Sequence, residues 1–299
     1  MKKFILFVAA ALAVVACQKN FDINYPIAFN DSKVITKAIV ENGTFPDGDF
    51  GVFADINTIG QALTAQGTDF MNNDMYTNAG GTITAATTKY WIANTQTQFY
   101  AYYPYSAGVT NYLLDVNASA KDDACIDVML AKPAIVTYNA EDDAPGAVAL
   151  NFEHQLAFIE FQVKEGTIVS EVAVNDVTFT VNQTAKLNVK TGAWSDKGGS
   201  GAYHFAKTSG ITSSYASMGK VLVVPQDAVA ITITYTAKVL GYTVGPKTRT
   251  IPVSKLGTSS WVGGKKYIYK ISIDSSDVIS FSSSVSGWQD GAGTGTVIY

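Results

Sequence analysis

Large apolar side chains occupy every second position of Val229-Ala230-Ile231-Thr232-Ile233-Thr234-Tyr235-Thr236. A period of two places these β-branched and aromatic residues on one face of an extended strand. No stretch carries an apolar stripe of helical period for more than two or three turns. The sequence therefore predicts an all-β fold. The same period of two recurs in three further groups: Val177, Phe179 and Val181; Leu187 and Val189; Tyr267, Tyr269, Ile271 and Ile273.

The apolar phase changes within the segment 151–164. Phe152, Leu156 and Phe158 fall on even positions, whereas Ile159 and the apolar residues after it fall on odd positions. A shift of one residue moves every side chain to the opposite face of a strand, and a β-bulge is the usual local cause. We therefore expect a bulge near Ala157.

Turn signals cut the chain at short intervals, for example at Pro46-Asp47-Gly48-Asp49 and Lys197-Gly198-Gly199. Many short strands between such turns are typical of β-sandwiches. The polar segment 138–146 ends in Pro145-Gly146 just before a strong strand pattern, so we expect a linker there. The expected division is a signal peptide (1–16), a tether with a candidate removable strand (17–37), and β-sandwich domains at 38–145 and 146–299.

The first seventeen residues have the pattern of an export signal. Lys2 and Lys3 precede an apolar run from Phe4 to Val15, and Cys17 follows a small residue. This run is too short for a permanent membrane-spanning helix. The cysteine after Val-Val-Ala resembles the lipobox of bacterial lipoproteins, which implies acylation of Cys17 and a lipid anchor. The alternative is an ordinary secretory signal with an incidental cysteine.

The segment after Cys17 contains a clean alternation. Apolar side chains at Phe21, Ile23, Tyr25, Ile27 and Phe29 share one face, which predicts a strand. Pro26 within it suits the edge of a sheet better than its centre, because proline cannot donate a backbone hydrogen bond.

The composition limits the classes of partner. Charged residues form 15% of the chain, hydrophobic residues 47%, and the net charge is −4. The absence of a basic run argues against nucleic acid as a partner. Arg249 is the single arginine, which argues against recognition of charged ligands. With Cys17 acylated, Cys125 has no disulfide partner, and its acidic neighbours predict a small half-buried residue, not a nucleophile.

The sequence contains no assembly of catalytic groups. His154 and His204 are the two histidines, they lie on different segments, and His154 is expected to be a hydrogen-bonded structural residue. No nucleophile elbow or phosphate-binding loop occurs. Loop acids (Asp47, Asp49, Asp142 and Asp143) could ligate calcium, but solvated side chains are the expectation. We therefore expect no enzyme, no cofactor and no metal.

Aromatic residues are abundant, with 16 Tyr, 15 Phe and 4 Trp. Packing in the cores of two sandwiches is the expected use of these rings. The alternative is a platform for stacking sugars, which would require Trp91, Tyr102 and Tyr103 to line an accessible cleft.

Six segments, in order, resemble the fimbrillin-like family, the lipoprotein precursors of type V pili. They span nearly the whole chain after the signal: Phe50-Gly51-Val52-Phe53-Ala54; Tyr90-Trp91 with Phe99-Tyr100-Ala101-Tyr102-Tyr103-Pro104; Asn151-Phe152-Glu153-His154-Gln155-Leu156-Ala157; Val221-Leu222-Val223-Val224-Pro225-Gln226; Trp261 to Tyr269; and Val285 to Trp288. The resemblance implies two transthyretin-like β-sandwiches in tandem, and a structural pilus subunit on the outer membrane and in the fimbrium.

The resemblance also implies a mode of assembly with other pilus subunits. In such pilins a protease cuts after a basic residue, the N-terminal strand leaves, and a strand of a neighbouring subunit fills the groove. The cut would fall between Lys37 and Ala38, where lysine replaces the family's arginine. The donor strand would be Thr296, Val297, Ile298 and Tyr299. The alternative is a surface glycan-binding or adhesin lipoprotein that does not polymerise and binds a host or glycan ligand.

Overall fold

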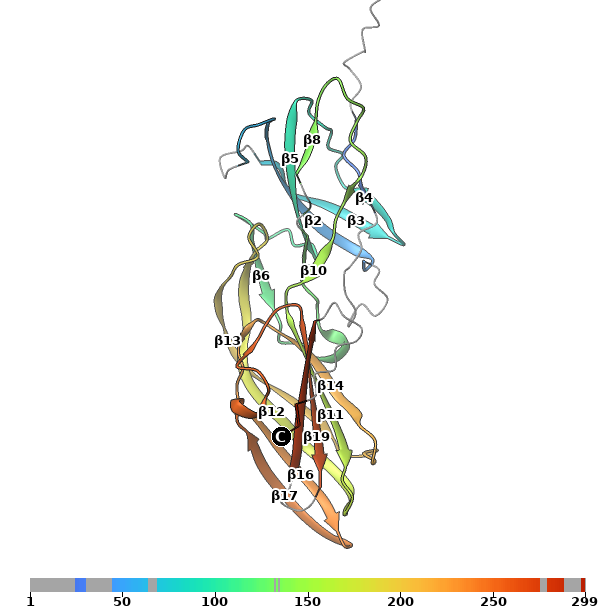
Figure 1. Cartoon of the computed structure of the whole chain (residues 1–299), viewed down its shortest axis with the longest axis vertical. Coiled ribbons are helices and arrows are strands. Elements are labelled where there is room, and N and C mark those ends of the chain that lie inside the picture. The colour runs from blue at the N-terminus through green and yellow to red at the C-terminus, as the bar shows by residue number, and fades with distance from the viewer. Residues whose placement is uncertain are drawn as a thin grey trace, which may run out of the picture.

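The computed structural model describes residues 25–30, 45–63, 69–131, 133, 135–274, 279–287 and 297–298. Within these ranges every regular element is a strand except two short 3-10 turns, η1 (Asp122–Ala124) and η2 (Val253–Lys255). The strands form two lobes stacked along the long axis of the molecule (Figure 1). The all-β prediction is confirmed.

The first lobe is built on one large antiparallel sheet, in which the strands follow the order β10-β7-β5-β2-β3-β4 and β8 also pairs with β5. Its strands are β2 (Gly48–Thr58), β3 (Asp69–Ala79), β4 (Thr82–Ala85), β5 (Thr95–Tyr103), β7 (Met129–Ala131), β8 (Val136–Tyr138) and β10 (Phe152–His154). A two-stranded sheet of β1 (Phe29–Asn30) and β9 (Val148–Ala149) completes this lobe.

The second lobe is a sandwich of two sheets. One sheet comprises β14 (Ala216–Val223), β11 (Ala157–Glu165), β19 (Lys265–Ile273), β20 (Ile279–Gly287) and β21 (Val297–Ile298), in that order. The other comprises β13 (Trp194–Lys207), β12 (Val169–Asn188), β16 (Ile231–Val239) and β17 (Tyr242–Ile251), with β6 (Leu113–Asn117) also paired to β12. A short pair, β15 (Gln226–Asp227) and β18 (Ser260–Trp261), closes one end.

The predicted alternation decides which face of each strand is buried. On β16, Ile231, Ile233 and Tyr235 are buried, whereas Thr232 and Thr234 are half-buried on the outer face. The apolar residues of β12 and β19 meet those of β16 in one core. These two sheets therefore bury their apolar faces against each other, which is the defining feature of a β-sandwich.

The phase change at 151–164 has a different cause from the predicted bulge, so that prediction is wrong. β10 ends at His154 in the first lobe's sheet, and β11 begins at Ala157 in the second lobe. Leu156 and Phe158 face a core that joins the lobes, whereas Ile159 faces the core of the second lobe. The chain is thus buried on both faces because it crosses between lobes, and the one irregularity in β11 pairing falls at Phe161/Gln162.

The polar segment expected as a linker lies inside the first lobe. Residues 139–147 connect β8 to β9, and both of these strands pair with elements of that lobe. Sheet membership changes after β10, between His154 and Ala157. Conversely, β6 lies between strands of the first lobe in the sequence, but it pairs with β12 of the second lobe. Whether the lobes fold as separate transthyretin-like domains remains a prediction.

A glycine in the middle of β2 tests the packing of the first lobe. Gly51 pairs with Tyr102 across the sheet, and a methyl group at Gly51 would overlap the Tyr102 ring. The Tyr102 hydroxyl lies 2.6 Å from Asn73 Oδ1 and 2.9 Å from the Ser106 carbonyl, either of which can accept its proton, and it accepts from Ser106 N (3.1 Å), so the ring has little freedom to move. We predict that Gly51→Ala lowers the free energy of unfolding by about 1–3 kcal/mol, measured by urea denaturation. Gly146→Ala, which meets nothing within 4 Å, is the matched control and should be near neutral.

Candidate functional site: the N-terminal strand and its slot

The site is the place where the segment 25–30 enters the first lobe. Ile27 and Phe29 are buried, whereas Pro26, Ala28 and Asn30 are exposed. This alternation is the one that the sequence predicts, as far as the structure describes the segment. Tyr25, Ile27 and Phe29 therefore point toward the core of the first lobe.

Backbone hydrogen bonds hold the segment on both sides. On one side, Ile27 N donates to Lys89 O (2.8 Å) and Trp91 N donates to Tyr25 O (2.9 Å). On the other side, Val148 N donates to Ala28 O (2.8 Å), and β1 runs parallel to β9. We call the space between the backbones of residues 89–91 and 148–149 the slot. If the segment left, the slot would expose unpaired backbone groups along both walls.

Pro26 fits this arrangement because it costs no hydrogen bond to the 89–91 wall. It forms a bridge with Tyr90 in which the bonds are made by Tyr25 and Ile27, its two neighbours. Pairing to the opposite wall begins only at Ala28. Pro26 itself is therefore paired on one side, although the segment that contains it lies between two neighbours.

Aromatic side chains form the floor of the slot. The Phe29 ring lies edge-to-face with Tyr76 (centroids 4.9 Å apart, 84°) and with Phe99 (5.4 Å, 89°). Tyr25 meets Tyr138 in the same geometry at 6.2 Å. Burial of one large apolar side chain contributes about 1.5–3 kcal/mol, so Ile27 and Phe29 together stabilise the seated segment by several kcal/mol.

The C-terminal segment adds an edge strand to the second lobe. β21 pairs antiparallel with β20, with Ile298 opposite Ser282 and Val297 opposite Ser283. Of the four candidate donor residues, only Val297 and Ile298 lie within the described residues; Thr296 and Tyr299 lie outside them. Cys17, Lys37 and Ala38 also lie outside the described residues.

Three aromatic residues that a sugar platform would require are packed inside the protein. Trp91 packs against Phe99 (5.8 Å), and Tyr102 is fully buried in the core that joins the lobes. Tyr103 is half-buried against Phe45 (5.4 Å). These residues therefore form no exposed stacking surface, and the prediction that such rings serve as core is confirmed for Trp91 and Tyr102.

The titratable residues singled out in the sequence have structural contacts. His154 is buried in contact with Asp127; burial raises the pKa of the Asp127 carboxyl, and His154 opposes that rise. Cys125 is half-buried, and burial raises the pKa of its thiol, which disfavours the reactive thiolate. His204 Nδ1 lies 3.0 Å from Asp176 Oδ2 at the surface, far along the chain from His154.

The loop acids act as hydrogen-bond acceptors. Asp47 accepts from Gly80 N (2.8 Å), Asp49 from Thr77 Oγ1 (2.6 Å), and Asp142 from Asn139 Nδ2 (2.8 Å). Among the described residues no group of three or more His, Cys, Asp or Glu side chains could hold a metal ion. Within those same ranges, no helix is long and apolar enough to cross a membrane.

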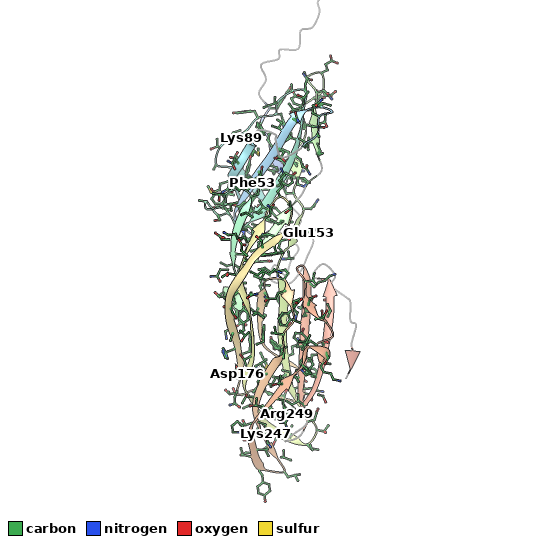
Figure 2. The ribbon with its side chains drawn as sticks, turned by 90° about the vertical axis from the view of Figure 1, so that its left-hand side faces the viewer. Phe53, Lys89, Glu153, Asp176, Lys247 and Arg249 are labelled. Carbon is green, nitrogen blue, oxygen red and sulfur yellow. The ribbon has the colours of Figure 1, made fainter. Side chains whose placement is uncertain are left out.

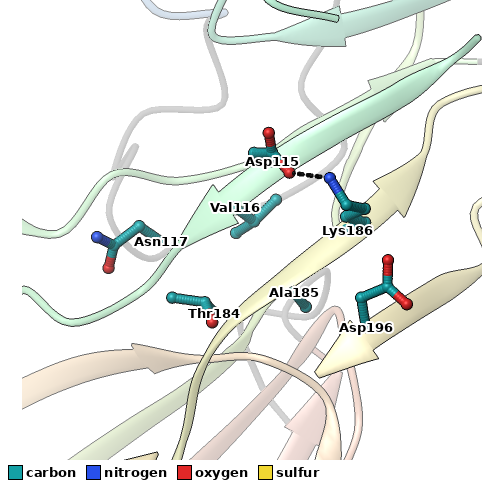
Figure 3. Close-up of a pocket in the computed structure, with 7 residues that line it drawn as sticks. All are labelled: Asp115, Val116, Asn117, Thr184, Ala185, Lys186 and Asp196. Carbon is teal, nitrogen blue, oxygen red and sulfur yellow. Dashed lines mark hydrogen bonds and ion pairs between the residues drawn. The ribbon is translucent and has the colours of Figure 1, made fainter. Parts of the chain in front are cut away.

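A shallow surface depression lies where β6, β12 and β13 meet (Figure 3). Its polar groups include the ion pair between Lys186 Nζ and Asp115 Oδ1 (2.6 Å) and the nearby Asp196. Asp115 is exposed and Lys186 is partly exposed, so water screens this pair and it contributes little to stability. Thr184 and Asn117 also line the depression, and we assign no function to it.

A buried charge joins the two lobes, and the sequence did not predict it. Lys190, in the turn between β12 and β13, forms an ion pair with the buried Asp55 of β2. The Lys190 ammonium also lies 5.3 Å and 5.1 Å from the rings of Tyr100 and Tyr112. Asp55 and Lys190 are 135 residues apart, so sequence spacing gave no signal of their contact. The pair fixes the β12–β13 turn against the first lobe.

This geometry defines a class of all-β proteins in which an N-terminal segment of the chain, here residues 25–30, fills a slot in the first lobe. The fimbrillin-like family model matches residues 36–288, and the chain belongs to that family. No match to the chain was found among curated proteins.

Solved structures share the fold. A Bacteroides vulgatus fimbrial protein matches with a TM-score of 0.59 at 15% identity, over 89% of this chain and 100% of that protein. A Bacteroides uniformis protein, provisionally assigned to cell adhesion, matches with a TM-score of 0.60 at 22% identity, over 89% and 98%. A Bacteroides ovatus protein with the same provisional assignment gives 0.59 at 16% identity, over 89% and 98%.

Truncation of the Phe29 side chain tests the slot. We predict that Phe29→Ala lowers the free energy of unfolding by about 3 kcal/mol, because the ring leaves a cavity between Tyr76 and Phe99. Amide exchange should rise at Val148 and Trp91, whose N–H groups bond the segment. The exposed neighbour provides the control: Asn30→Ala should change neither quantity. Unchanged exchange in Phe29→Ala would contradict this account of the slot.

The contact between the lobes should weaken at alkaline pH. Burial and the Asp55 carboxylate raise the pKa of Tyr100 to about 12, against 10 for an exposed tyrosine. Between pH 10 and pH 12 the folded state keeps the Tyr100 proton that the unfolded chain loses. The contribution of Tyr100 to the free energy of unfolding is therefore full below pH 10 and falls between pH 10 and pH 12. Urea denaturation at a series of pH values measures this fall. Tyr100→Phe should make it shallower; an equally steep fall would show that Tyr100 does not contribute.

Proposed function

We propose that this chain is a structural subunit of a cell-surface fimbrium that assembles by strand exchange after proteolysis. The single observation that carries the proposal is the seated segment 25–30, which pairs with both walls of the slot and fills its apolar floor. A strand from another subunit with the same alternation would restore both the backbone bonds and the side-chain packing. Membership of the fimbrillin-like family supports this role.

Processing would begin at the N-terminus. Residues 1–16 would direct export, and acylated Cys17 would hold the precursor at the outer membrane as a surface-exposed lipoprotein. A cut between Lys37 and Ala38 would separate the segment 25–30 from the body covalently. The segment would then remain only by the contacts described above, and an incoming strand could replace it.

The donor strand in this proposal is the C-terminal segment Thr296–Tyr299. Among the residues that the structure describes, β21 pairs with β20 at Val297 and Ile298 and lies at the edge of its sheet, so a strand there has a sheet neighbour on one side. By composition, the preceding Asp290-Gly291-Ala292-Gly293 would act as a hinge that lets Thr296–Tyr299 reach another subunit. Alternate side chains of the donor would occupy the pockets that Ile27 and Phe29 occupy in the precursor.

A structural role fits the chemistry of the described residues better than catalysis does. The buried Asp127–His154 pair belongs to the interior, and the half-buried Cys125 is not activated. Assembly needs only shape and backbone pairing. A non-polymerising adhesin that binds a host or glycan ligand is the second candidate, and one observation favours it: Lys37 stands where the family's processing site has arginine.

Limited proteolysis tests polymerisation. The chain from Gln18 to Tyr299, at low micromolar concentration, is treated with trypsin, and the cut is located by mass spectrometry. We predict that cleavage after Lys37 yields polymers that persist on dilution, measured by size-exclusion chromatography with light scattering.

Two variants control this experiment. Lys37→Gln should resist the cut and form no persistent polymers. A chain ending at Gly295, without the donor residues, should be cut normally yet fail to polymerise. Wild-type protein that is cut after Lys37 and stays monomeric would refute strand exchange and leave the adhesin role.

A further inference from the structure

The outer face of the sheet that contains β11 and β19 carries two neighbouring lysines. Tyr269 and Ile271 of β19 lie in the core of the second lobe, so Lys270 between them points away from that core. Lys164 of β11 pairs in register with Ser272, which is on the same face of β19 as Lys270. Both lysines are half-buried. They are diagonal neighbours on adjacent strands, a spacing that long side chains can bridge.

An exposed tyrosine lies beside these two lysines. Tyr215, directly before β14, is 40% exposed. The β11–β14 register pairs Val163 with Ala216, which places Tyr215 next to Lys164. Lys164 Nζ lies 4.9 Å, and Lys270 Nζ 5.3 Å, from the centroid of the Tyr215 ring. We call Lys164, Lys270 and Tyr215 the lysine–tyrosine patch.

The two ammonium groups of the patch repel each other. Each gains about 0.5–1 kcal/mol from its contact with the Tyr215 ring, but within the described ranges neither is in an ion pair with a carboxylate. By contrast, Lys266 on the same face of β19 has Glu160 Oε2 at 3.8 Å. Like charges side by side on a sheet are destabilising. An anion bound between Lys164 and Lys270 would remove this repulsion, so the patch indicates an acidic ligand.

Neutral hydrogen-bonding side chains flank the patch on the same face. Lys270 pairs in register with Gln162 of β11 on one side and with Ser282 of β20 on the other. Gln162 and Ser282 are both partly exposed. Amide and hydroxyl groups can donate hydrogen bonds to sugar hydroxyls and also accept from them.

Two carboxylates bound the patch along the strands. Asp274, after the end of β19, accepts from Ser272 Oγ (2.8 Å), and Glu160 accepts from Gln162 Nε2 (3.1 Å). Burial and the Asp274 carboxylate raise the pKa of Tyr215, so its hydroxyl stays protonated and can donate. The face thus combines two cations with acceptors and donors for hydroxyl groups. A ligand that carries both an acid and hydroxyls matches this set better than a bare anion does.

We propose that the lysine–tyrosine patch binds an acidic saccharide, whose carboxylate or sulfate lies between Lys164 and Lys270 and whose hydroxyls bond the flanking Gln162 and Ser282. The single arginine of the chain does not oppose this, because lysine acts as a point charge and needs no bidentate geometry. Insertion into a lipid surface fits less well, since this face presents one partly exposed ring among polar groups.

This inference goes beyond the proposed function, because the patch is on the second lobe and the slot is in the first. In a fimbrium every subunit would repeat the patch. A long acidic polysaccharide could then bind several subunits at once, and its avidity would exceed the affinity of one patch.

The experiment uses uncut protein from Gln18 to Tyr299 at low salt and follows binding by isothermal titration calorimetry. The probes are hexasaccharides of chondroitin sulfate, which carries sulfate and carboxylate, of hyaluronan, which carries carboxylate alone, and maltohexaose, which is neutral. We expect saturable binding of at least one acidic hexasaccharide, weaker at high salt, and none of maltohexaose.

Substitutions locate the binding. Lys164→Gln and Lys270→Gln should each weaken it at least tenfold, whereas Lys270→Arg, which keeps the charge, should bind within about twofold of wild type. Lys247→Gln is the matched control: it removes one half-buried lysine from β17, in the other sheet of the second lobe, and should change nothing (Figure 2). Melting temperatures confirm that each variant is folded.

Four results would overturn the proposal. The first is no saturable binding of either acidic hexasaccharide at millimolar concentration, and the second is equal binding of maltohexaose. The third is an equal loss in Lys247→Gln, which would show attraction to net charge alone. The fourth is flotation with phosphatidylglycerol vesicles that Lys164→Gln abolishes, without hexasaccharide binding, which would assign the patch to an anionic membrane. Trypsin-driven polymerisation is scored separately, so its failure would refute strand exchange and leave this measurement unaffected.

Discussion

The two-sided backbone pairing of residues 25–30 is the constraint on which the first lobe depends. Buried backbone N–H and C=O groups without a hydrogen-bond partner raise the free energy of the folded state. This segment pairs with the backbone of both walls of the slot. Its buried side chains also complete the aromatic core beneath it. The segment is therefore part of the fold of the precursor, and any occupant that replaced it would have to meet the same requirements of hydrogen bonding, alternation and ring size.

A shared apolar core couples the second lobe to the first. The sheet of the first lobe is buried on both faces: Val52 and Phe99 face the core that contains Phe29, whereas Phe53 and Tyr100 face the core shared with the second lobe. The Asp55–Lys190 pair lies at this shared boundary. Any arrangement of the lobes that separated this pair would leave an uncompensated buried charge. The pair therefore favours the observed arrangement.

Sequence patterns predicted local structure well where burial is one-sided. The alternation in β16 and in Tyr25–Phe29 matches the buried faces, because a period of two maps directly onto the two faces of a strand. The same reasoning failed at Ala157. There the chain passes between three cores, and a change of phase that resembled a bulge marked a change of lobe. The acidic loop 139–147 resembled a linker for a similar reason: polarity reports exposure, which linkers and end loops share.

The sequence by itself determined the all-β character, the alternating strands, the family and the absence of any recognisable catalytic motif, because these depend on residue type and short spacing. Tertiary structure alone decided that β6 crosses to the second lobe, that Lys190 meets Asp55, and that Tyr102 lies in the core between the lobes. Such contacts join residues far apart in the chain. They depend on how whole sheets pack, and no local pattern carries that information.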